Sequence, residues 1–240
     1  MKIYITIIFF IIILLSLYNS RVTEHYSNKK NIILYNFLYG NKTLPYEEIF
    51  PLKKYNFYNK QLYGPNKLDL LKVLYGSNYM THAKRQYGPD RKYGPDRKLF
   101  KIRNFQPANI NYSNGCSKDS ERCLFWKQEN YLIPPCCANH LTELLFYITE
   151  LFDKYNITYF IYYGTLLGAI RHNGLIPWDT DIDIFIDSKS KEKLKKLKNV
   201  INKDTHYKLN ISKDLKTPSR LSYSSKNKQH IDIYNYDVVN

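Results

Sequence analysis

The chain has 240 residues, which is enough for one well-buried α/β domain and additional segments. It contains 36 Lys and Arg against 21 Asp and Glu, for a formal net charge of +15. Such a surplus attracts phosphates, polyanions and acidic membranes but does not specify a fold. Because the sequence contains no recognised nucleic-acid-binding module, we do not expect nucleic acid as a partner.

The N-terminus predicts a membrane anchor. Residues 3–18 form an almost unbroken apolar run that follows Lys2. The candidate cleavage sites place a large residue where a signal peptidase requires a small one, so we expect residues 1–20 to remain as a signal anchor. A catalytic domain in the lumen of the endoplasmic reticulum or Golgi would follow, and a cleaved, secreted chain is the alternative. The Asn-x-Ser/Thr sequons agree with a lumenal location. They begin at Asn41, Asn111, Asn156 and Asn210.

The next part of the chain predicts a connecting stem. Residues 21–110 are rich in Tyr, Asn, Lys and Pro and show little sustained periodicity. They include the hexapeptide Tyr-Gly-Pro-Asp-Arg-Lys twice in tandem, at 87–92 and 93–98. We interpret this region as a partly disordered stem. A cysteine-containing loop is expected at 111–137, and a catalytic domain at 138–240.

Residues 138–240 alternate between helical and strand patterns. Apolar residues at Leu141, Leu144, Leu145 and Ile148 have the spacing of an amphipathic helix. Other stretches are short, β-branched or aromatic, which is typical of buried strands. The expected helices are 138–155, 166–172 and 189–202, and the expected strands are 157–162, 182–186, 207–211, 220–224 and 230–234. The pattern predicts an α/β (α+β) domain with a mixed sheet and flanking helices.

The most informative stretch is an aspartate cluster. Asp181 and Asp183 point to the same face if residues 182–186 form a strand. Two close carboxylates repel each other, and a divalent cation such as Mg²⁺ or Mn²⁺ relieves this. Asp179 lies at the mouth of the strand, where it could join the ligands. Asp232 could complete the cluster from a neighbouring strand or accept a proton. Solvation of exposed strand faces is the alternative interpretation of these aspartates.

A turn before the cluster offers a phosphate site. Gly164 and Thr165 lie between a predicted strand and a predicted helix, where backbone N–H groups and a hydroxyl can bind phosphate. Arg171 on the same helix could hold a donor phosphate. The alternatives are a tight turn with an N-cap, and a surface charge. Together with the aspartates, the turn predicts phosphoryl-type transfer.

Residues 163–184 resemble the signature of the LicD family, which includes fukutin and the fukutin-related protein. The sequence is Tyr-Gly-Thr-Leu-Leu-Gly-Ala-Ile-Arg-His-Asn-Gly-Leu-Ile-Pro-Trp-Asp-Thr-Asp-Ile-Asp-Ile, and the resemblance extends over about residues 136–235. It implies a nucleotidyltransferase-like fold. It also implies transfer of a phospho-alcohol, phosphocholine or ribitol phosphate, from a CDP-linked donor to a glycan on a glycoprotein or glycolipid.

The family pattern also assigns roles to individual residues. Asp181 and Asp183 match the metal-binding pair, Asp179 the leading aspartate and Asp232 the later strand aspartate. Thr180 stands where many members have another aspartate. The chain ends at Asn240, soon after Asp232, which leaves open an inactive membrane-anchored scaffold of the same fold. A nucleotidyltransferase that uses a nucleoside triphosphate is a further alternative.

The cysteines indicate a structural site ahead of the catalytic domain. They are Cys116, Cys123, Cys136 and Cys137. In a lumenal protein, two disulfides are the ordinary expectation. The arrangement resembles the zinc-binding loop of the fukutin-related protein, although the second gap is shorter here. We therefore expect either a structural Zn²⁺ bound by all four cysteines or two disulfides.

Overall fold

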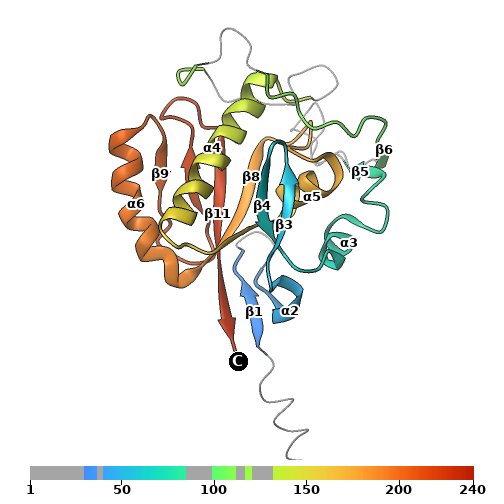
Figure 1. Ribbon diagram of the computed structural model, residues 1–240, viewed down its shortest axis with the longest axis horizontal. Helices are drawn as coiled ribbons and strands as arrows, with labels where there is room; N and C mark the ends of the chain where they lie inside the picture. Colours follow the sequence, from blue (N-terminus) through green and yellow to red (C-terminus); the bar gives the residue numbers. More distant parts are fainter. Residues whose placement is uncertain (1–29, 37–39, 85–98, 112–116, 121–131) are drawn as a thin grey trace, which may run out of the picture.

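The computed structural model describes residues 30–36, 40–84, 99–111, 117–120 and 132–240. These residues form a mixed seven-stranded sheet with helices around it and two small hairpins beside it (Figure 1). None of the helices in these ranges is long and apolar enough to cross a membrane. The predicted anchor at residues 1–20 lies outside the described part of the chain.

The long strand β11 organises the sheet. It pairs in parallel with β8 along one edge and antiparallel with β10 along its first residues, while β9 extends the sheet from β10 and β7 from β8. This combination of pairings makes the sheet mixed, as the sequence predicted. The strands of this group are β7 (Tyr159–Ile161), β8 (Asp181–Asp187), β9 (Lys208–Asn210), β10 (Ser219–Ser222) and β11 (His230–Val239).

The end of β11 pairs with a segment from the predicted stem. β1 (Asn31–Leu34) runs antiparallel to it, with Leu34 opposite Tyr236, and β2 (Lys42–Pro45) pairs with β1. Since Leu34 is fully buried, β1 belongs to the same folded unit as β8 and β11. The sheet therefore includes two strands from the region that the sequence analysis assigned to the stem.

More of the predicted stem packs against the sheet. Phe57, Leu62 and Leu71 are buried in the same core as the apolar residues of β8 and β11. Their elements are too short to show a sustained pattern in the sequence. Packing against the core stabilises these elements. The elements are α2 (Tyr46–Ile49), β3 (Lys53–Phe57), β4 (Lys60–Gly64), α3 (Asp69–Tyr75), β5 (His82–Lys84) and β6 (Leu99–Lys101). The tandem hexapeptide lies outside the described residues.

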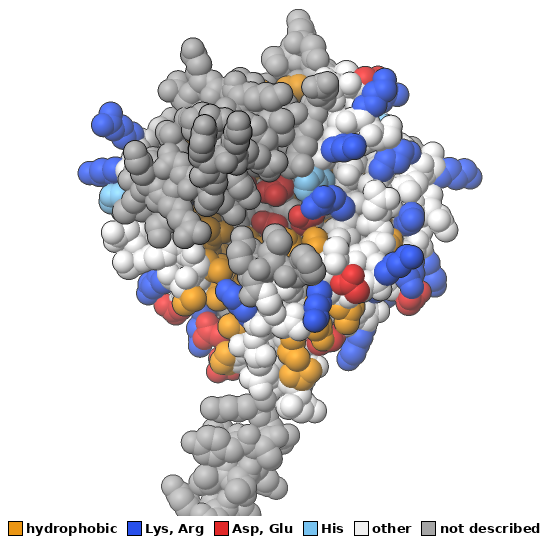
Figure 2. Space-filling view, turned by 180° about the vertical axis from the view of Figure 1, so that it is seen from behind, with side chains coloured by type: hydrophobic (Ala, Val, Ile, Leu, Met, Phe, Trp, Pro, Cys, Tyr) orange, Lys and Arg blue, Asp and Glu red, His pale blue; other side chains and the backbone are white. Residues whose placement is uncertain are grey.

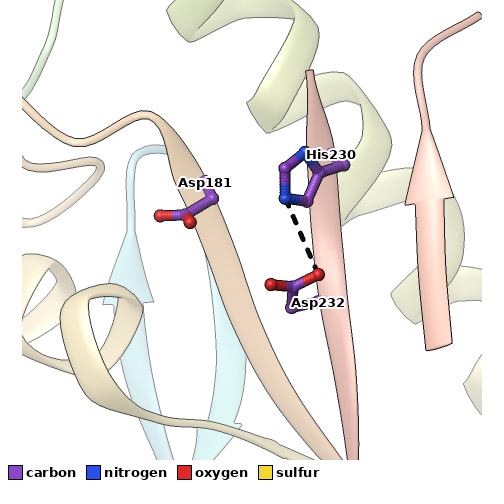
Figure 3. Close-up of side chains that lie close together, drawn as sticks. All are labelled: Asp181, His230 and Asp232. Atoms are coloured by element: carbon purple, nitrogen blue, oxygen red, sulfur yellow. Dashed lines mark ion pairs between the residues drawn. The ribbon is translucent and has the colours of Figure 1, made fainter. Parts of the chain in front are cut away.

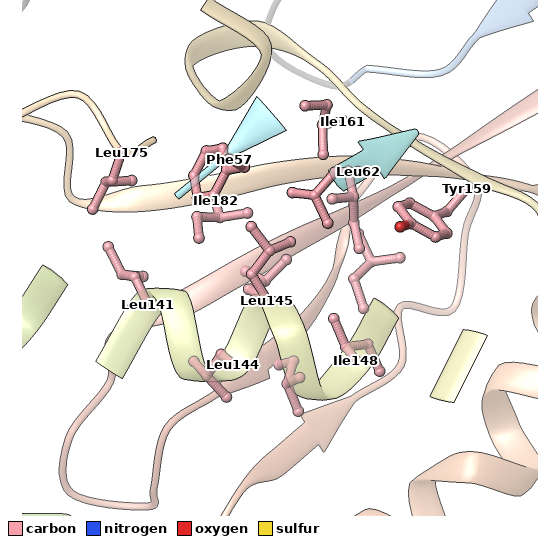
Figure 4. Packing of buried hydrophobic residues seen from close by; sticks show 14 of the residues in the cluster. Phe57, Leu62, Leu141, Leu144, Leu145, Ile148, Tyr159, Ile161, Leu175 and Ile182 are labelled. Carbon is pink, nitrogen blue, oxygen red and sulfur yellow. The ribbon is translucent and has the colours of Figure 1, made fainter. Parts of the chain in front are cut away.

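Three longer helices follow the predicted order. They are α4 (Pro135–Lys154), α5 (Tyr163–His172) and α6 (Lys191–Asp204), with a short 3₁₀ turn at Ser188–Ser190 before α6. α4 has Pro135 at its first position. Proline suits this position because a backbone N–H there would have no acceptor within the helix. Leu141 and Leu145 of α4 point toward Ile182 (Figure 4), and Leu144 is buried in the same core. Burying each such side chain contributes about 1.5–3 kcal/mol.

The two faces of the sheet have different contents. Ile182, Ile184 and Ile186 of β8 point to the core on the α4 side. Phe185 and Tyr234 belong to a separate aromatic cluster on the opposite face, which we call the front face. On this face the first residues of β8 and β11 are aspartates and a histidine instead of the aromatic residues that follow. One end of an otherwise apolar surface is therefore polar.

Candidate active site

The aspartates meet on the front face because β8 and β11 are parallel neighbours. In the register, Asp183 lies opposite Asp232 and Asp181 lies opposite His230. Possible ligand atoms of Asp181, His230 and Asp232 all lie within 4.8 Å of one another (Figure 3). Figure 2 shows acidic side chains gathered near the middle of one side of the molecule, beside a histidine and basic side chains. The structure therefore brings together the three carboxylates on which the sequence prediction depended.

Asp179 joins the cluster from the loop before β8. Its carboxylate contacts Gly164 in the first turn of α5 so closely that a Cβ atom at residue 164 would collide with it. The Oδ1 atom of Asp179 also accepts a hydrogen bond of 3.1 Å from the backbone N–H of Thr180. Gly164 is thus required for the close approach of this aspartate to the start of α5.

Two carboxylates of the cluster have a raised pKa. The pKa of Asp183 is raised well above its ordinary value, first by withdrawal from water and then by the charges of Asp181, Asp179 and Asp232. The pKa of Asp179 is raised for the same two reasons, with Asp181 as the nearest charge. Because burial and mutual repulsion destabilise the ionised carboxylates, a bound cation would stabilise the cluster.

His230 gives the cluster a nitrogen donor. Its Nδ1 atom lies 2.8 Å from the carbonyl oxygen of Lys228, and since a carbonyl can only accept, Nδ1 carries the proton. In the neutral ring the Nε2 lone pair then lies on the side of Asp232, whose Oδ1 atom is 3.6 Å away. A histidine held through Nδ1–H with Nε2 turned to carboxylates is the usual arrangement at a metal site.

The residues present fit a divalent cation. Asp181 and Asp232 would supply oxygen atoms, His230 would supply a nitrogen atom, and Asp183 and Asp179 lie beside them. Mg²⁺ and Mn²⁺ prefer oxygen ligands, and a nitrogen ligand favours Mn²⁺ of the two.

Thr165 differs from the prediction. Its side chain is buried, and its hydroxyl oxygen accepts a hydrogen bond of 2.8 Å from the backbone N–H of Asp183. The buried hydroxyl therefore joins α5 to β8. Gly164, by contrast, is at the cluster, where it contacts Asp179.

Arg171 also differs from the prediction. The side chain is only 7% exposed, and its Nη1 atom donates a 2.6 Å hydrogen bond to the carbonyl oxygen of Tyr79. Its Nε atom donates to Nε2 of His172 at 2.9 Å, and burial lowers its pKa to about 10. These contacts fasten α5 to the segment after α3, so the predicted role as a phosphate clamp is replaced by a structural one.

Arg220 and His230 were missed from the sequence. Arg220 is opposite Asp232 in the β10–β11 register, and its Nε and Nη2 atoms donate to the two carboxylate oxygens of Asp232 at 2.7 and 3.3 Å. His230 is two residues before Asp232, so strand alternation alone would have placed both on one face. The position of Arg220 depends on a register that the sequence does not reveal.

Two pockets open beside the cluster and share Arg220 and Asn210 as walls. The first, the neutral pocket, has a volume of about 400 Å³ and contacts Asp232. It is lined by Asn36, Asn210, Ile211, Ser212, Thr217, Pro218, Arg220, Asp232 and Tyr234. The second, the basic pocket, has a volume of about 410 Å³ and contacts His230. It is lined by Asn202, Lys208, Asn210, Arg220, Ser222, Ser224, Ser225, Lys228 and His230.

The cysteine prediction is only partly described. Cys136 and Cys137 lie in the first turn of α4, and both are disulfide-bonded. This corresponds to the disulfide alternative. Cys116 and Cys123 lie outside the described residues, and a zinc site stays a prediction.

Comparison with known proteins agrees with this geometry. Residues 156–240 match the nucleotidyltransferase domain of the LicD/FKTN/FKRP family. The mouse ribitol 5-phosphate transferase FKRP is 38% identical over 80 residues, which are 30% of this chain and 16% of that protein. The Haemophilus influenzae lipopolysaccharide cholinephosphotransferase LicD is 50% identical over 44 residues, which are 18% of this chain and 17% of that protein.

The family match includes the whole aspartate site, whereas each relative is matched over only a small part of its length. The chain aligns with less than a fifth of the length of these two transferases. The matched region begins just after α4 and includes β7, α5, β8 and the strands up to the end of β11. Both relatives are named as transferases of phosphate-linked groups. Residues 156–240 are thus similar to the nucleotidyltransferase domain of the LicD/FKTN/FKRP family.

Proposed function

We propose that this protein is a metal-dependent transferase that moves a phospho-alcohol from a CDP-linked donor to a glycan. The observation that carries the proposal is the pairing of Asp183 with Asp232 and of Asp181 with His230 on adjacent parallel strands. This pairing concentrates negative charge at one point beside two pockets, as transfer between two substrates requires. The names of the relatives support phosphocholine or ribitol phosphate as the kind of group transferred.

The reaction consists of one displacement at phosphorus. A hydroxyl oxygen of the glycan attacks the phosphorus atom that bears the alcohol, and the bond from that phosphorus to the bridging oxygen breaks. CMP leaves with the bridging oxygen, and the proton of the attacking hydroxyl passes to a carboxylate. Asp232 is the proposed acceptor of this proton, since its carboxylate lies at the edge of the neutral pocket. A bound Mg²⁺ or Mn²⁺ would neutralise charge on the phosphate oxygens.

The other residues of the site position these groups. Thr165 fixes the backbone of Asp183 through its hydroxyl, and Gly164 allows Asp179 to approach the start of α5. The neutral pocket offers amide and hydroxyl groups together with the ring of Tyr234, a combination that suits a nucleoside or a sugar. Tyr234 itself is anchored among aromatic rings, which fixes the floor of this pocket.

The cellular setting is proposed from the sequence. The apolar run at residues 3–18 supports a membrane anchor, with the domain in the lumen of the endoplasmic reticulum or Golgi. The sequon residues Asn41, Asn111 and Asn156 are exposed, as glycan attachment requires. Asn210 is also exposed but lines both pockets, and a glycan there would obstruct them. We therefore expect the active protein to lack a glycan at Asn210.

Release of CMP tests the proposal. The full chain, purified in detergent, is incubated with CDP-choline or CDP-ribitol and Mn²⁺, with CTP and ATP as alternative donors. CMP is expected only with a CDP-alcohol and a divalent cation, and Asp183→Asn should reduce the rate by about 10³-fold. Asp153→Asn is the matched control, because Asp153 is exposed on α4 away from the site. Turnover of CTP or ATP in place of the CDP-alcohols, or no metal-dependent turnover, would refute the proposal.

A further inference from the structure

The charge on the front face changes sign from one strand to the next. One row across the sheet runs from Asp183 on β8 through Asp232 on β11 to Arg220 on β10. The next row runs from Asp181 through His230 and Ser222, and ends at Lys208 on β9. Adjacent strands are about 4.8 Å apart, so the change from acidic to basic occurs within about 15 Å. The acidic end is the candidate metal site, and the function proposed above assigns no particular ligand to the basic end.

The basic end is a pocket and not merely a charged surface. It contains Lys208, Arg220 and Lys228, and no aspartate or glutamate is among its lining residues. Its volume of about 410 Å³ is at the lower end of the range for small-molecule sites. Ser222 and Ser225 add hydroxyl groups to the lining. A cavity with cations, hydroxyls and no carboxylate is chemically complementary to an oxyanion.

The positive charge in this pocket is only partly compensated. Arg220 forms an ion pair with Asp232, and within the described part of the chain neither lysine forms one, which leaves the two lysines as the excess charge. The Nζ atom of Lys208 lies 3.4 Å from the carbonyl oxygen of Asn202, a neutral group that places the ammonium without neutralising it. Lys228 is exposed, and its carbonyl oxygen holds His230. Arg220 therefore lies between Asp232, which neutralises its charge, and the two lysines, which carry the excess positive charge.

We propose that the basic pocket binds a phosphate group of a substrate, next to the metal site but through different residues. Lys208 and Lys228 would supply the charge, with Ser222 and Arg220 as hydrogen-bond donors. The pocket has room for a phosphate and part of the sugar or alcohol that carries it. The phosphate belongs either to the donor or to a phosphorylated acceptor, and only this identification rests on the proposed function. Binding of the phosphate itself requires no metal.

The test measures binding of ribose 5-phosphate to the full chain in detergent and EDTA by calorimetry. Wild-type protein should bind it, and the double variant Lys208→Gln/Lys228→Gln should bind at least about tenfold more weakly, because charge-assisted hydrogen bonds are the stronger ones. The control Lys53→Gln/Lys196→Gln removes the same net charge from exposed positions outside the pocket and should bind as wild type does. Equal melting temperatures of the two double variants exclude unfolding as the cause.

Two further measurements separate this proposal from the proposed function. Asp183→Asn should keep ribose 5-phosphate binding in EDTA even though it stops CMP release. In the presence of Mn²⁺, competition between CDP-choline and ribose 5-phosphate would assign the pocket to the donor. Simultaneous binding of both would assign it to the acceptor. The proposal is overturned if wild-type protein does not bind ribose 5-phosphate, or if Lys208→Gln/Lys228→Gln binds it as tightly as the control does.

Discussion

Arg220 donates two hydrogen bonds to Asp232, and in doing so it occupies both oxygens of a carboxylate that borders the candidate metal site. The side chain of Arg220 is 51% exposed while that of Asp232 is 9% exposed, so the pair lies at the boundary between the protein and its solvent-filled pockets. A cation at the cluster and the guanidinium of Arg220 therefore compete for the same oxygen atoms. Removal of the arginine should affect cation and phosphate binding in opposite directions.

Arg220→Gln is expected to strengthen Mn²⁺ binding by about three- to tenfold, since an exposed ion pair of about 1 kcal/mol no longer opposes it. The same change should weaken ribose 5-phosphate binding, because the basic pocket loses a cation. Calorimetric titration with each ligand measures both effects, and Arg220→Lys should shift both affinities less. A parallel loss of both affinities would show that Arg220 only maintains the fold.

His230 should be detectable as a nitrogen ligand. With Mn²⁺ bound, electron spin echo spectra should show modulation from a directly coordinated imidazole nitrogen, because Nδ1–H is held by Lys228 and Nε2 is left to coordinate. His230→Gln should remove this modulation and weaken Mn²⁺ binding about tenfold or more. His82→Gln, at a partly exposed position on β5, should leave the spectrum unchanged. A wild-type spectrum without nitrogen modulation would contradict this assignment.

The aspartate cluster should cost stability when no cation is bound. The pKa of Asp183 is raised in the folded state, so its contribution to stability is present below its unfolded pKa of about 3.9 and is lost as pH rises through the raised value. Asp183→Asn should therefore stabilise the cation-free protein at pH 7 by about 1 kcal/mol. Thermal unfolding in EDTA between pH 5 and 8 measures this, and the gain should shrink toward the acid end. Added Mn²⁺ should raise the melting temperature of the wild type more than that of the variant. A variant less stable than wild type in EDTA at pH 7 would disprove this account of the cluster.

Gly164 should be irreplaceable for cation binding. Gly164→Ala places a methyl group against the Asp179 carboxylate, which must move away from the cluster. We expect Mn²⁺ affinity to fall by about tenfold or more, since a displaced ligand or supporting group has this order of effect. Gly40→Ala is the comparison: Gly40 has a φ of +73° and nothing near its added Cβ, so that variant should lose about 1 kcal/mol of stability and keep its Mn²⁺ affinity. Unchanged Mn²⁺ affinity in Gly164→Ala would show that Asp179 takes no part.

Arg171 should matter for stability and not for donor binding. Arg171→Met keeps much of the buried volume but removes the hydrogen bond to the carbonyl oxygen of Tyr79, leaving that oxygen without this donor. Urea unfolding should show a loss of about 2–4 kcal/mol, and CDP-choline affinity in Mn²⁺ should stay within about twofold of wild type. The reverse result, with stability kept and affinity lost, would restore the phosphate-clamp role that the sequence predicted.

The fold of residues 138–240 could be predicted because its patterns are local. The spacing of Leu141, Leu144 and Leu145 identified α4, and the alternation of Asp181 and Asp183 with isoleucines identified β8 and its polar face. That Asp232 joins them followed from the family resemblance and from its β-branched neighbours. The sequence therefore predicted the acidic half of the site.

The remaining parts of the site depend on contacts between distant segments. Asp232 contacts Arg220 because of the register between two strands. Arg171 contacts Tyr79, which is 92 positions away in the chain. Neither relation leaves a periodic signal. The buried position of Thr165 was missed for a similar reason, because a hydroxyl in a Gly-Thr turn suits a ligand and a backbone N–H equally well. β1 was hidden because a strand of four residues among tyrosines and asparagines resembles an irregular segment.

The pairing of β1 with the last residues of β11 limits how short a fragment of this chain can be and still stay in solution. A fragment that begins at α4 would contain every residue of the aspartate cluster but would leave the backbone N–H and C=O groups from Tyr236 to Val239 without their strand partner. It would also expose the apolar surface that Ile32 and Leu34 cover. An unprotected strand edge next to an apolar patch is a template for self-association, and such a fragment should precipitate or form oligomers where a longer one remains dispersed.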